Sequence, residues 1–405
     1  MNDKIALVHP YRHHCYHSME GILQYSNNAV ALLGYFDKND VLDRVVRHTS
    51  AAKKIGGYSN NNIEKNVYTN LLIKALFLAN KKFPKLERVY ISVFEKWAIK
   101  QIKKKKITVV HVLQDYCNSV IYYCYTHGIK VVYEQIQPFD VLQRNIMQEE
   151  MAKIGYSQEQ IKSKTEQIKE KISKQVVNLK NAAAIICASE VTKQSINSYA
   201  DSNKCFTFPY GSIDSDYSKR DLREKLLLKK DKIRILYVGQ FNTLKGVYYI
   251  IEVAKKLEYL KDIEFLMIGK PTESADERLV SLALGLNNVK YISEVPHTEI
   301  ADLYKKCDIF VFQGLCEGFG MVTLEAMGVG LPCLVSKGGI GVVSDGENGF
   351  VNENCDVDAL VSNILRLRND KSERNMMSMN AFETAKKYNW KRFADKIEDV
   401  YNRIF

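Results

Sequence analysis

Short apolar runs recur along this chain, and the stretches between them are long enough to form helices. One series of runs lies in the amino-terminal half, at residues 5–8, 109–112, 130–133 and 184–187. Another follows residue 230, at residues 233–238, 265–268, 289–292, 309–312 and 333–335. Apolar runs that alternate with helical patterns are typical of parallel strands joined by helical crossovers. The pattern therefore predicts two successive α/β domains.

The boundary between these domains should fall where the regular pattern stops. Pro209 and Gly211 precede a cluster of serine and aspartate residues, and residues of these types favour turns and loops. We place the boundary near residue 212, which gives a first domain of residues 1–212 and a second of residues 213–387.

One long polar stretch interrupts the first series of predicted strands. Residues 139–180 are rich in helix formers and are broken only near Gly155. The stretch predicts one or two helices with polar faces, and it lacks the sustained heptads of a coiled coil.

Composition narrows the function classes without choosing one. The 405 residues carry a formal charge of +11, which favours an anionic partner such as a phosphate ligand, a nucleic acid or an acidic membrane. The amino-terminal apolar stretch is too short for a signal peptide, and no apolar run reaches the ~18 residues of a membrane span, so we expect a cytoplasmic protein. Nine scattered cysteines without a C-x-x-C pair indicate reduced thiols rather than a disulfide framework or zinc site.

Lysines gather in two places in the first half, at residues 103–106 and at Lys81, Lys82 and Lys85. Together they predict a basic face. Its simplest interpretation is a solvated helix end, and the alternative is peripheral contact with anionic lipids at the inner face of a membrane. Nucleic acid is not expected, because no recognition motif accompanies the charge.

The segment EGFGMVTLE follows a buried strand and opens a helix. The amides of Phe319, Gly320 and Met321 would point from the helix start toward a phosphate or sugar oxygen. Glu317 and Glu325 lie about two helical turns apart and can face one crevice, where carboxylates accept hydrogen bonds from vicinal diols. A glutamate at a helix start is also a common electrostatic cap, and a glutamate within a helix is usually solvated.

A second loop lies at the end of another predicted strand. In VGQFNTLKG, Gly239 and Gln240 follow the strand and Lys245 precedes the next helix. Ligands of such sheets bind at the carboxyl ends of the strands, so Lys245 can reach a diphosphate there, although a loop lysine is often only solvated.

With these motifs in place, the chain resembles the family-4 retaining glycosyltransferases, which have the GT-B fold and share an E-x7-E element. The resemblance covers residue 184 to the end and includes EGFG, VGQFNTLKG, IGK with Gly269 and Lys270, CDIFVF, DGENGF, PYGSID and CASE. It implies two Rossmann-like domains that face each other across a crevice. It also implies that residues 388–405 pack back onto the first domain.

The resemblance assigns roles to the motif residues. Glu317 contacts the donor sugar, Glu325 binds the nucleotide ribose and Lys245 binds the diphosphate, with no metal or other cofactor. The family's arginine after the first glycine is Gln240 here, which removes one cation from the leaving group. Arg12, Lys270 and Lys337 are candidates to replace that charge, or each is an ordinary surface residue.

The acceptor side of the crevice is predicted from the first domain. The loop HPYRHHCYHSMEG contributes His9, Arg12 and Gly21, and its clustered histidines and cysteine lack the spacing of a metal site. Glu134 follows a predicted strand, where it can bind the acceptor hydroxyl or stabilise an oxocarbenium ion. An ion-paired structural carboxylate is the alternative for Glu134.

The sequence thus predicts transfer of a sugar from a nucleoside diphosphate sugar to a hydroxyl of a glycan or lipid-linked acceptor, in cell-surface polysaccharide or glycoconjugate synthesis. One alternative is a catalytically weakened sugar-nucleotide-binding or scaffold protein, which Gln240 favours. Another is a different GT-B enzyme, such as a sugar phosphorylase or an epimerase.

Overall fold

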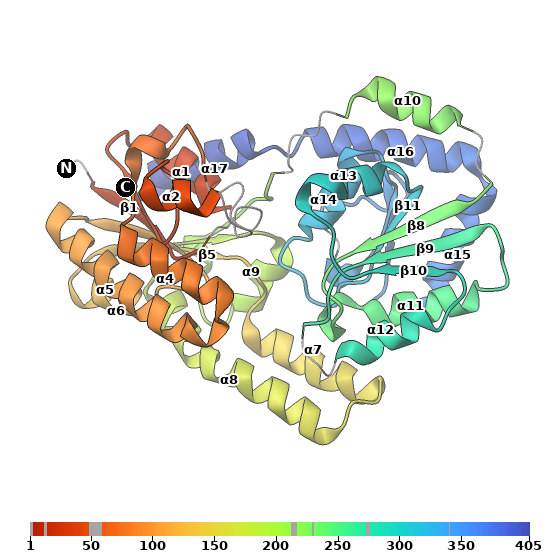
Figure 1. The fold of residues 1–405 in the computed structure, drawn as a ribbon, viewed down its shortest axis with the longest axis horizontal. Helices are drawn as coiled ribbons and strands as arrows, with labels where there is room; N and C mark the ends of the chain where they lie inside the picture. Colours follow the sequence, from red (N-terminus) through yellow and green to blue (C-terminus); the bar gives the residue numbers. More distant parts are fainter. Residues whose placement is uncertain are drawn as a thin grey trace.

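The computed structural model describes residues 3–11, 14–47, 59–211, 217–228, 231–272, 276–339 and 341–405. These residues form two α/β domains side by side, each built on a twisted parallel sheet with helices on both faces (Figure 1). The predicted fold class is confirmed. The first sheet ends before the predicted boundary at residue 212 and the second begins after it, and residue 212 itself lies outside the described residues.

The first sheet has the strand order β3-β2-β1-β4-β5-β6-β7, and all of its pairs are parallel. Its strands β1 and β4 are buried along their whole length, as expected for a sheet covered on both faces. The strands are β1 (Ile5–His9), β2 (Val30–Leu33), β3 (Val67–Tyr68), β4 (Val109–Leu113), β5 (Lys130–Gln135), β6 (Ala184–Cys187) and β7 (Cys205–Thr207). The helices are α1 (Cys15–Tyr25), α2 (Val41–Arg47), α4 (Leu71–Lys82), α5 (Glu87–Lys105), α6 (Asn118–Thr126), α7 (Asp140–Lys153), α8 (Gln158–Asn181) and α9 (Glu190–Ile196), with the 3-10 turns η1 (Glu64–Asn66), η2 (Pro84–Leu86) and η3 (Ser202–Lys204).

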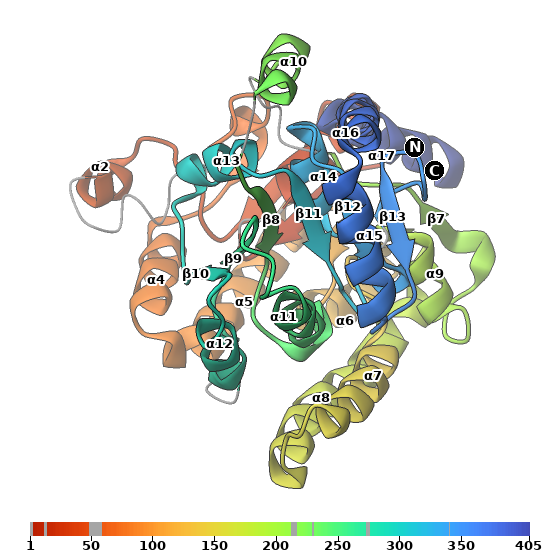
Figure 2. The same ribbon diagram turned by 90° about the vertical axis from the view of Figure 1, so that its right-hand side faces the viewer.

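The second sheet has the order β10-β9-β8-β11-β12-β13 and is also parallel throughout (Figure 2). Its strands are β8 (Ile233–Val238), β9 (Ile263–Ile268), β10 (Val289–Ile292), β11 (Ile309–Phe312), β12 (Cys333–Ser336) and β13 (Gly349–Asn352). The other elements are α10 (Lys219–Leu227), η4 (Thr243–Lys245), α11 (Val247–Lys256), α12 (Glu277–Leu284), α13 (His297–Lys305), α14 (Met321–Gly328), η6 (Lys337–Gly339), α15 (Val357–Asn369), α16 (Lys371–Lys386) and α17 (Trp390–Ile404).

The predicted polar stretch 139–180 forms two helices, α7 and α8, separated at Gly155. Gly155 has a φ of +82°, a conformation that glycine adopts without steric cost. Ser157 then caps α8, because its side chain accepts from the amide of Gln160 while the Gln160 side chain accepts from the amide of Ser157.

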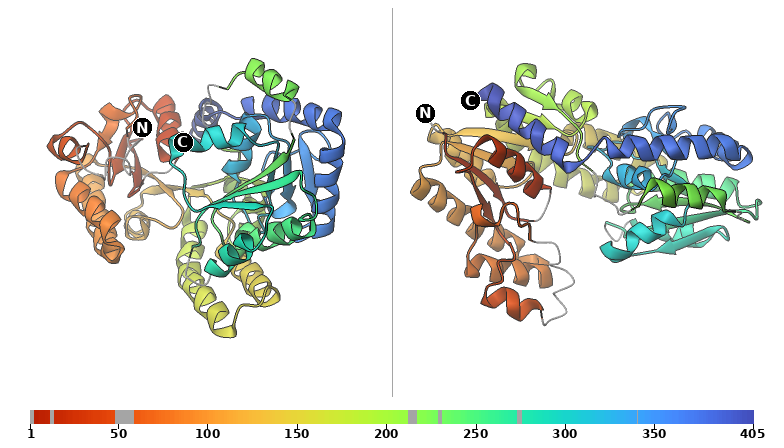
Figure 3. Two further views of the ribbon diagram at one scale, coloured as in Figure 1. Left: turned by 45° about the vertical axis from the view of Figure 1, so that its right-hand side comes forward. Right: turned by 90° about the horizontal axis from the view of Figure 1, so that it is seen from above.

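The last helix, α17, leaves the second domain and lies against α1 of the first (Figure 3). A Cβ atom on Gly21 would lie 2.4 Å from the carbonyl oxygen of Ala394 and 2.6 Å from Cβ of Ile397. Only glycine therefore allows α1 and α17 to approach this closely. Gly21, which we predicted on the acceptor side, is buried between two helices and serves their packing.

The two lysine clusters do not form one face. Lys81, Lys82 and Lys85 lie where α4 meets α5, whereas residues 103–106 lie at the far end of α5. The 19 residues of α5 separate these ends by about 28 Å at the helical rise per residue. The single basic face predicted from sequence is therefore wrong.

Candidate active site

The candidate site lies where the strand order of the second sheet changes direction. Strand β8 lies between β9 and β11 in the sheet. The chain passes from β8 to β9 and β10 on one side, and then from β11 to β12 and β13 on the other. Such a switch point leaves a crevice at the carboxyl ends of the two adjacent strands, where ligands of open α/β sheets bind. The loop after β8 carries Lys245, and the loop after β11 carries Glu317.

The two loops bring Lys245 and Glu317 together in an ion pair. Lys245 Nζ donates to Glu317 Oε1, and their side chains are 20% and 8% exposed. The side chain of Asn242 accepts from the backbone amide of Lys245 at 3.0 Å and holds the start of η4. A Cβ on Gly246 would lie 1.9 Å from the carbonyl oxygen of Gln313, so glycine is needed where the loops touch. The structure thus joins two residues that the sequence separates by 72 positions.

The turn between Glu317 and α14 presents free backbone donors. Gly320 has a φ of +71° and caps α14, and the amides of Phe319, Gly320 and Met321 have no hydrogen-bond acceptor within the described part of the chain. Amides at a helix start favour an anionic ligand through both hydrogen bonding and the helix dipole.

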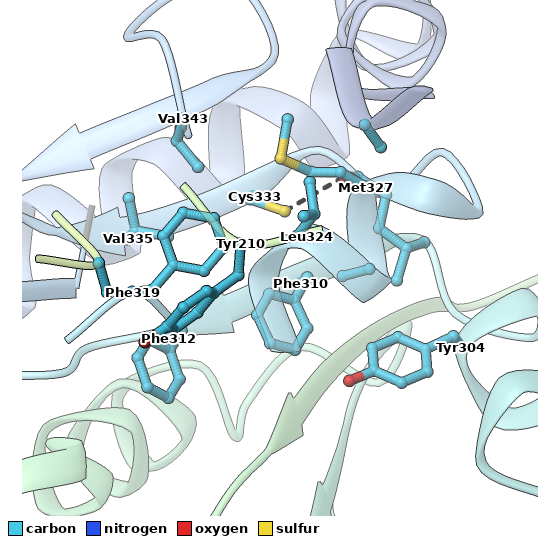
Figure 4. Close-up of a cluster of buried hydrophobic side chains, with 14 of the residues drawn as sticks. Tyr210, Tyr304, Phe310, Phe312, Phe319, Leu324, Met327, Cys333, Val335 and Val343 are labelled. Carbon is cyan, nitrogen blue, oxygen red and sulfur yellow. Dashed lines mark hydrogen bonds between the residues drawn. The ribbon is translucent and has the colours of Figure 1, made fainter. Parts of the chain in front are cut away.

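Glu325 lies about one turn into α14 and is mostly buried. Burial raises the pKa of Glu325, and a hydrogen bond from the Tyr304 hydroxyl at 3.1 Å partly offsets the rise. Figure 4 shows Tyr304 in the same apolar cluster as Phe310 of β11 and the buried side chains Leu324 and Met327 of this helix.

The remaining donor-side residues lie at the ends of β8 and β9. A Cβ on Gly269 would lie 1.7 Å from the carbonyl oxygen of Gly239, so the two loops meet backbone to backbone. Gln240 is exposed and accepts from Asn242 at 3.4 Å through its side chain. Lys270 pairs with Glu294 at 2.5 Å, and both side chains are more than half exposed.

Two other cations were proposed to replace the missing arginine. Lys337 pairs with Glu353 on the surface, and Arg12 lies outside the described residues. Among the described lysines, Lys245 is the one that contacts Glu317.

Glu134 is a buried structural carboxylate and not an acceptor-side group. Its side chain is 1% exposed and accepts from Ser18 Oγ at 2.5 Å, His14 Nε2 at 2.5 Å and His111 Nε2 at 2.6 Å. Burial would raise the pKa of Glu134, but the two histidines outweigh burial and hold that pKa well below its usual range. His111 Nδ1 in turn lies 3.0 Å from the Tyr401 hydroxyl, so the network fastens α17 to the first sheet. The catalytic role predicted for Glu134 is corrected to the structural alternative.

His9 ends β1 at the switch point of the first sheet, where β1 adjoins β4. Its ring is fully buried and packs edge-on against Tyr116, with centroids 5.1 Å apart. In this arrangement the imidazole of His9 does not reach solvent. The structure therefore gives no support to the predicted contact between this side chain and the acceptor.

Contacts from the first domain to the EGFG turn were not predicted. A Cβ on Gly318 would lie 1.9 Å from the carbonyl oxygen of Ile136, and Thr192 Oγ1 donates to the Gly318 carbonyl at 3.3 Å. Phe319 packs edge-on against Tyr210 at 5.5 Å (Figure 4). Tyr210 lies within PYGSID and Thr192 follows CASE, so these motifs marked the right segments without revealing what they touch.

Comparison with known proteins accords with this geometry. Residues 218–384 match the family model of the group 1 glycosyl transferases. That match covers η4, the Lys245 and Glu317 pair, and α14. It supports the glycosyltransferase resemblance, whereas the family-4 subclass and its E-x7-E element stay predictions.

Two curated relatives are similar over more than half of the chain. The UDP-Gal:alpha-D-GlcNAc-diphosphoundecaprenol alpha-1,3-galactosyltransferase of Escherichia coli is 29% identical over 244 residues, which cover 57% of this chain and 60% of the relative. The capsular polysaccharide biosynthesis glycosyltransferase CapM of Staphylococcus aureus is 30% identical over 236 residues, which cover 55% of this chain and 62% of the relative. The chain thus spans about three fifths of each of these relatives.

A solved structure extends the likeness to the whole chain at the level of fold. The sucrose-phosphate synthase of Thermosynechococcus elongatus superposes with a TM-score of 0.69 at 17% identity, and the alignment covers 100% of this chain and 99% of that one. The two-domain architecture is thus that of GT-B glycosyltransferases. None of the described helices is both long and apolar enough to span a lipid bilayer.

Proposed function

We propose that this protein is a retaining glycosyltransferase that moves a sugar from a nucleoside diphosphate sugar to an acceptor hydroxyl. The observation that carries the proposal is the Lys245 and Glu317 pair at the switch point of the second sheet, beside the amides of residues 319–321, which have no acceptor among the described residues. A cation and free amides suit a diphosphate, and a neighbouring carboxylate suits sugar hydroxyls.

Each donor group then has a partner. The diphosphate takes Lys245 and the amides, which frees Glu317 to accept hydrogen bonds from the sugar, while Glu325 accepts from the ribose diol. Lys245 and the amides stabilise the negative charge on the departing diphosphate. Glu134 is buried in its own network, so we propose that the departing diphosphate takes the proton of the acceptor hydroxyl. The acceptor then attacks on the face of the sugar from which the diphosphate leaves. Such front-face exchange retains the anomeric configuration and needs neither a protein nucleophile nor a metal.

The acceptor is proposed to be a glycan or a lipid-linked sugar in cell-surface polysaccharide synthesis. The names of the two relatives, one with a diphosphoundecaprenol substrate and one from capsule synthesis, support this choice. The corner between α4 and α5 offers a site for peripheral membrane contact on the cytoplasmic side. There Phe83 is 56% exposed among Lys81, Lys82 and Lys85, which combines an apolar anchor with charges that attract anionic lipid.

Donor screening followed by product analysis tests the reaction. A panel of nucleoside diphosphate sugars is first screened by thermal shift, because a bound donor stabilises the native state. Acceptor-dependent release of nucleoside diphosphate then reports transfer, and nuclear magnetic resonance of the product reports the anomeric configuration. A product of inverted configuration would refute the retaining mechanism.

The membrane contact is tested with vesicles of phosphatidylglycerol and phosphatidylcholine. Replacing Lys81, Lys82 and Lys85 with glutamate should abolish co-sedimentation with anionic vesicles. The same change at residues 103–105 is the matched control, because it removes equal charge from the far end of α5. Equal loss in both variants would contradict a localised contact.

A second function, sugar-nucleotide binding without transfer, is favoured by the exposed Gln240 in place of a cation. Tight donor binding without nucleoside diphosphate release would support it, and turnover that is lost in both Glu317→Ala and Lys245→Ala would exclude it. A sugar phosphorylase would instead transfer the sugar to inorganic phosphate and form a sugar phosphate, and an epimerase would form an epimerised sugar, in both cases without a glycan or lipid-linked acceptor.

A further inference from the structure

Helix α8 spans the two domains. Its 24 residues run below the first domain toward the second in Figure 1, and its last turns belong to the first domain. There Gln175 Nε2 donates to Asp115 Oδ1 at 2.7 Å, and the Tyr125 hydroxyl donates to the carbonyl of Asn178 at 2.9 Å. This end of α8 is thereby fixed to the loop after β4 and to α6.

The first turns of α8 are fixed to the second domain by a buried ion pair. Lys164 Nζ lies 2.9 and 3.1 Å from the two carboxylate oxygens of Asp276, and the side chains are 8% and 0% exposed. The Tyr156 hydroxyl donates to the same carboxylate at 2.9 Å. Arg278 donates in return to the carbonyls of residues 154 and 155, at 2.6 and 2.8 Å. The tip of the α7–α8 hairpin is thus held by a buried ion pair, a buried hydrogen bond and two further hydrogen bonds nearer the surface.

This attachment adjoins the elements that carry and follow Lys245. Tyr248, three residues after Lys245, packs against the buried apolar cluster at the hairpin tip, which consists of Met151, Ile154, Tyr156 and Ile161. The next residue, Tyr249, donates through its hydroxyl to Glu150 of α7. Helix α7 also contacts η4 itself. The first domain therefore contacts the proposed donor site in two places. Helix α7 contacts η4, which carries Lys245, and other residues of the first domain contact the EGFG turn.

We propose that the α7–α8 hairpin is a strut that sets the spacing of the two domains, with Lys164 and Tyr156 as positioning residues. The inference rests on the proposed function, because it explains how a donor on the second domain and an acceptor on the first are held at reacting distance. Between Lys164 and Gln175 the helix rises about 16 Å as one rigid segment. Moving one domain away from α8 would break the ion pair of Lys164 with Asp276 and the Tyr156 hydrogen bond to the same carboxylate, and these charge-assisted contacts resist opening of the crevice.

The strut predicts a specific kinetic pattern. Breaking its second-domain attachment should widen the distribution of domain spacings without removing any donor contact. Donor affinity should then change less than about twofold, whereas kcat for transfer should fall roughly 10²-fold, because a misplacement of about 1 Å has that effect on reacting groups. Water admitted to the crevice should also raise donor hydrolysis relative to transfer.

Electron paramagnetic resonance on the full chain measures the spacing directly. Spin labels are placed at Tyr122→Cys on α6 and Tyr259→Cys after α11, both 69% exposed in the wild type. The partly exposed thiols Cys205 and Cys355 are first replaced with serine. This distance measurement needs no activity, so it remains valid if the proposed function fails and the wild type turns over no donor.

The variant Lys164→Met is compared with Lys162→Met, an exposed lysine on the same end of α8. A broadened distance distribution and reduced transfer in Lys164→Met alone support the strut. Wild-type distances and transfer in Lys164→Met would overturn it, as would a parallel loss of donor affinity and thermal stability with unchanged distances. Tyr156→Phe, which removes only the hydroxyl, should show the same pattern to a smaller degree and replaces Lys164→Met if that variant does not fold.

Discussion

Alanine at Gly318 tests the contact between the EGFG turn and the first domain. The added Cβ would lie 1.9 Å from the carbonyl oxygen of Ile136, about 1.5 Å closer than an ordinary contact, and 3.3 Å from Cα of Gln137. The obstacle is backbone, so the turn and the first domain must separate by roughly 1 Å or more. We expect a loss of about 10²-fold in acceptor-dependent release of nucleoside diphosphate. Overpacking should lower the free energy of unfolding by about 1–3 kcal/mol.

The matched control is Gly328→Ala, ten residues further on at the end of α14. A Cβ there meets nothing within 4 Å, so turnover should stay at the wild-type level and stability should rise by up to about 1 kcal/mol. Urea unfolding and turnover are measured for both variants at one temperature. Wild-type turnover in a folded Gly318→Ala protein would refute the reasoning, because the crevice would then work without this contact.

Three further predictions concern the carboxylates and the missing cation. Burial raises the pKa of Glu325, and the hydrogen bond from the Tyr304 hydroxyl opposes the rise. Tyr304→Phe should therefore shift the acid limb of donor binding to higher pH when donor Kd is measured against pH. An unshifted limb would count against a ribose contact by ionised Glu325. The pKa of Glu134 lies well below its usual range, so its stabilisation is fully present above the ordinary carboxyl pKa and is lost as pH falls through the folded value. Glu134→Gln should therefore lower the free energy of unfolding by about 3 kcal/mol in urea titrations at pH 7. Glu149→Gln, at an exposed position, is the control and should leave it unchanged. A loss below about 0.5 kcal/mol in Glu134→Gln would show that the network does not stabilise the fold. Gln240→Arg should raise kcat about tenfold by adding a cation beside the leaving group, and an unchanged or lower kcat would show that Lys245 and the amides suffice.

Local sequence patterns predicted most strands because strands of a sheet that helices cover on both faces are rich in apolar residues. The runs at 184–187, 233–238, 289–292 and 309–312 match β6, β8, β10 and β11 residue for residue. Of the edge strands, β10 was predicted, whereas β3 and β7 were not: β3 has two residues and β7 is only half-buried, so neither leaves such a run. The loops with Lys245 and Glu317 were found because glycine marks both turns.

Contacts between distant segments could not be predicted from one sequence. Glu134 ends a strand as a ligand-binding carboxylate would, and only the fold shows His14, Ser18 and His111 around it. Gly21 looked like a loop residue of the acceptor side until α17 was seen against it. The polar faces of α7 and α8 likewise did not indicate which domain they contact. The sequence alone does not distinguish a buried lysine such as Lys164 from a solvent-exposed one.

The central claim is that the Lys245 and Glu317 pair marks a working donor site. Steady-state release of nucleoside diphosphate, with the donor identified by thermal shift and an acceptor present, tests it most directly in Lys245→Met. The matched control is Lys256→Met, which removes a half-exposed surface lysine of the same domain. We predict a 10²- to 10³-fold lower kcat, by order of magnitude, in Lys245→Met and wild-type turnover in the control. Wild-type turnover in a folded Lys245→Met protein would contradict the account.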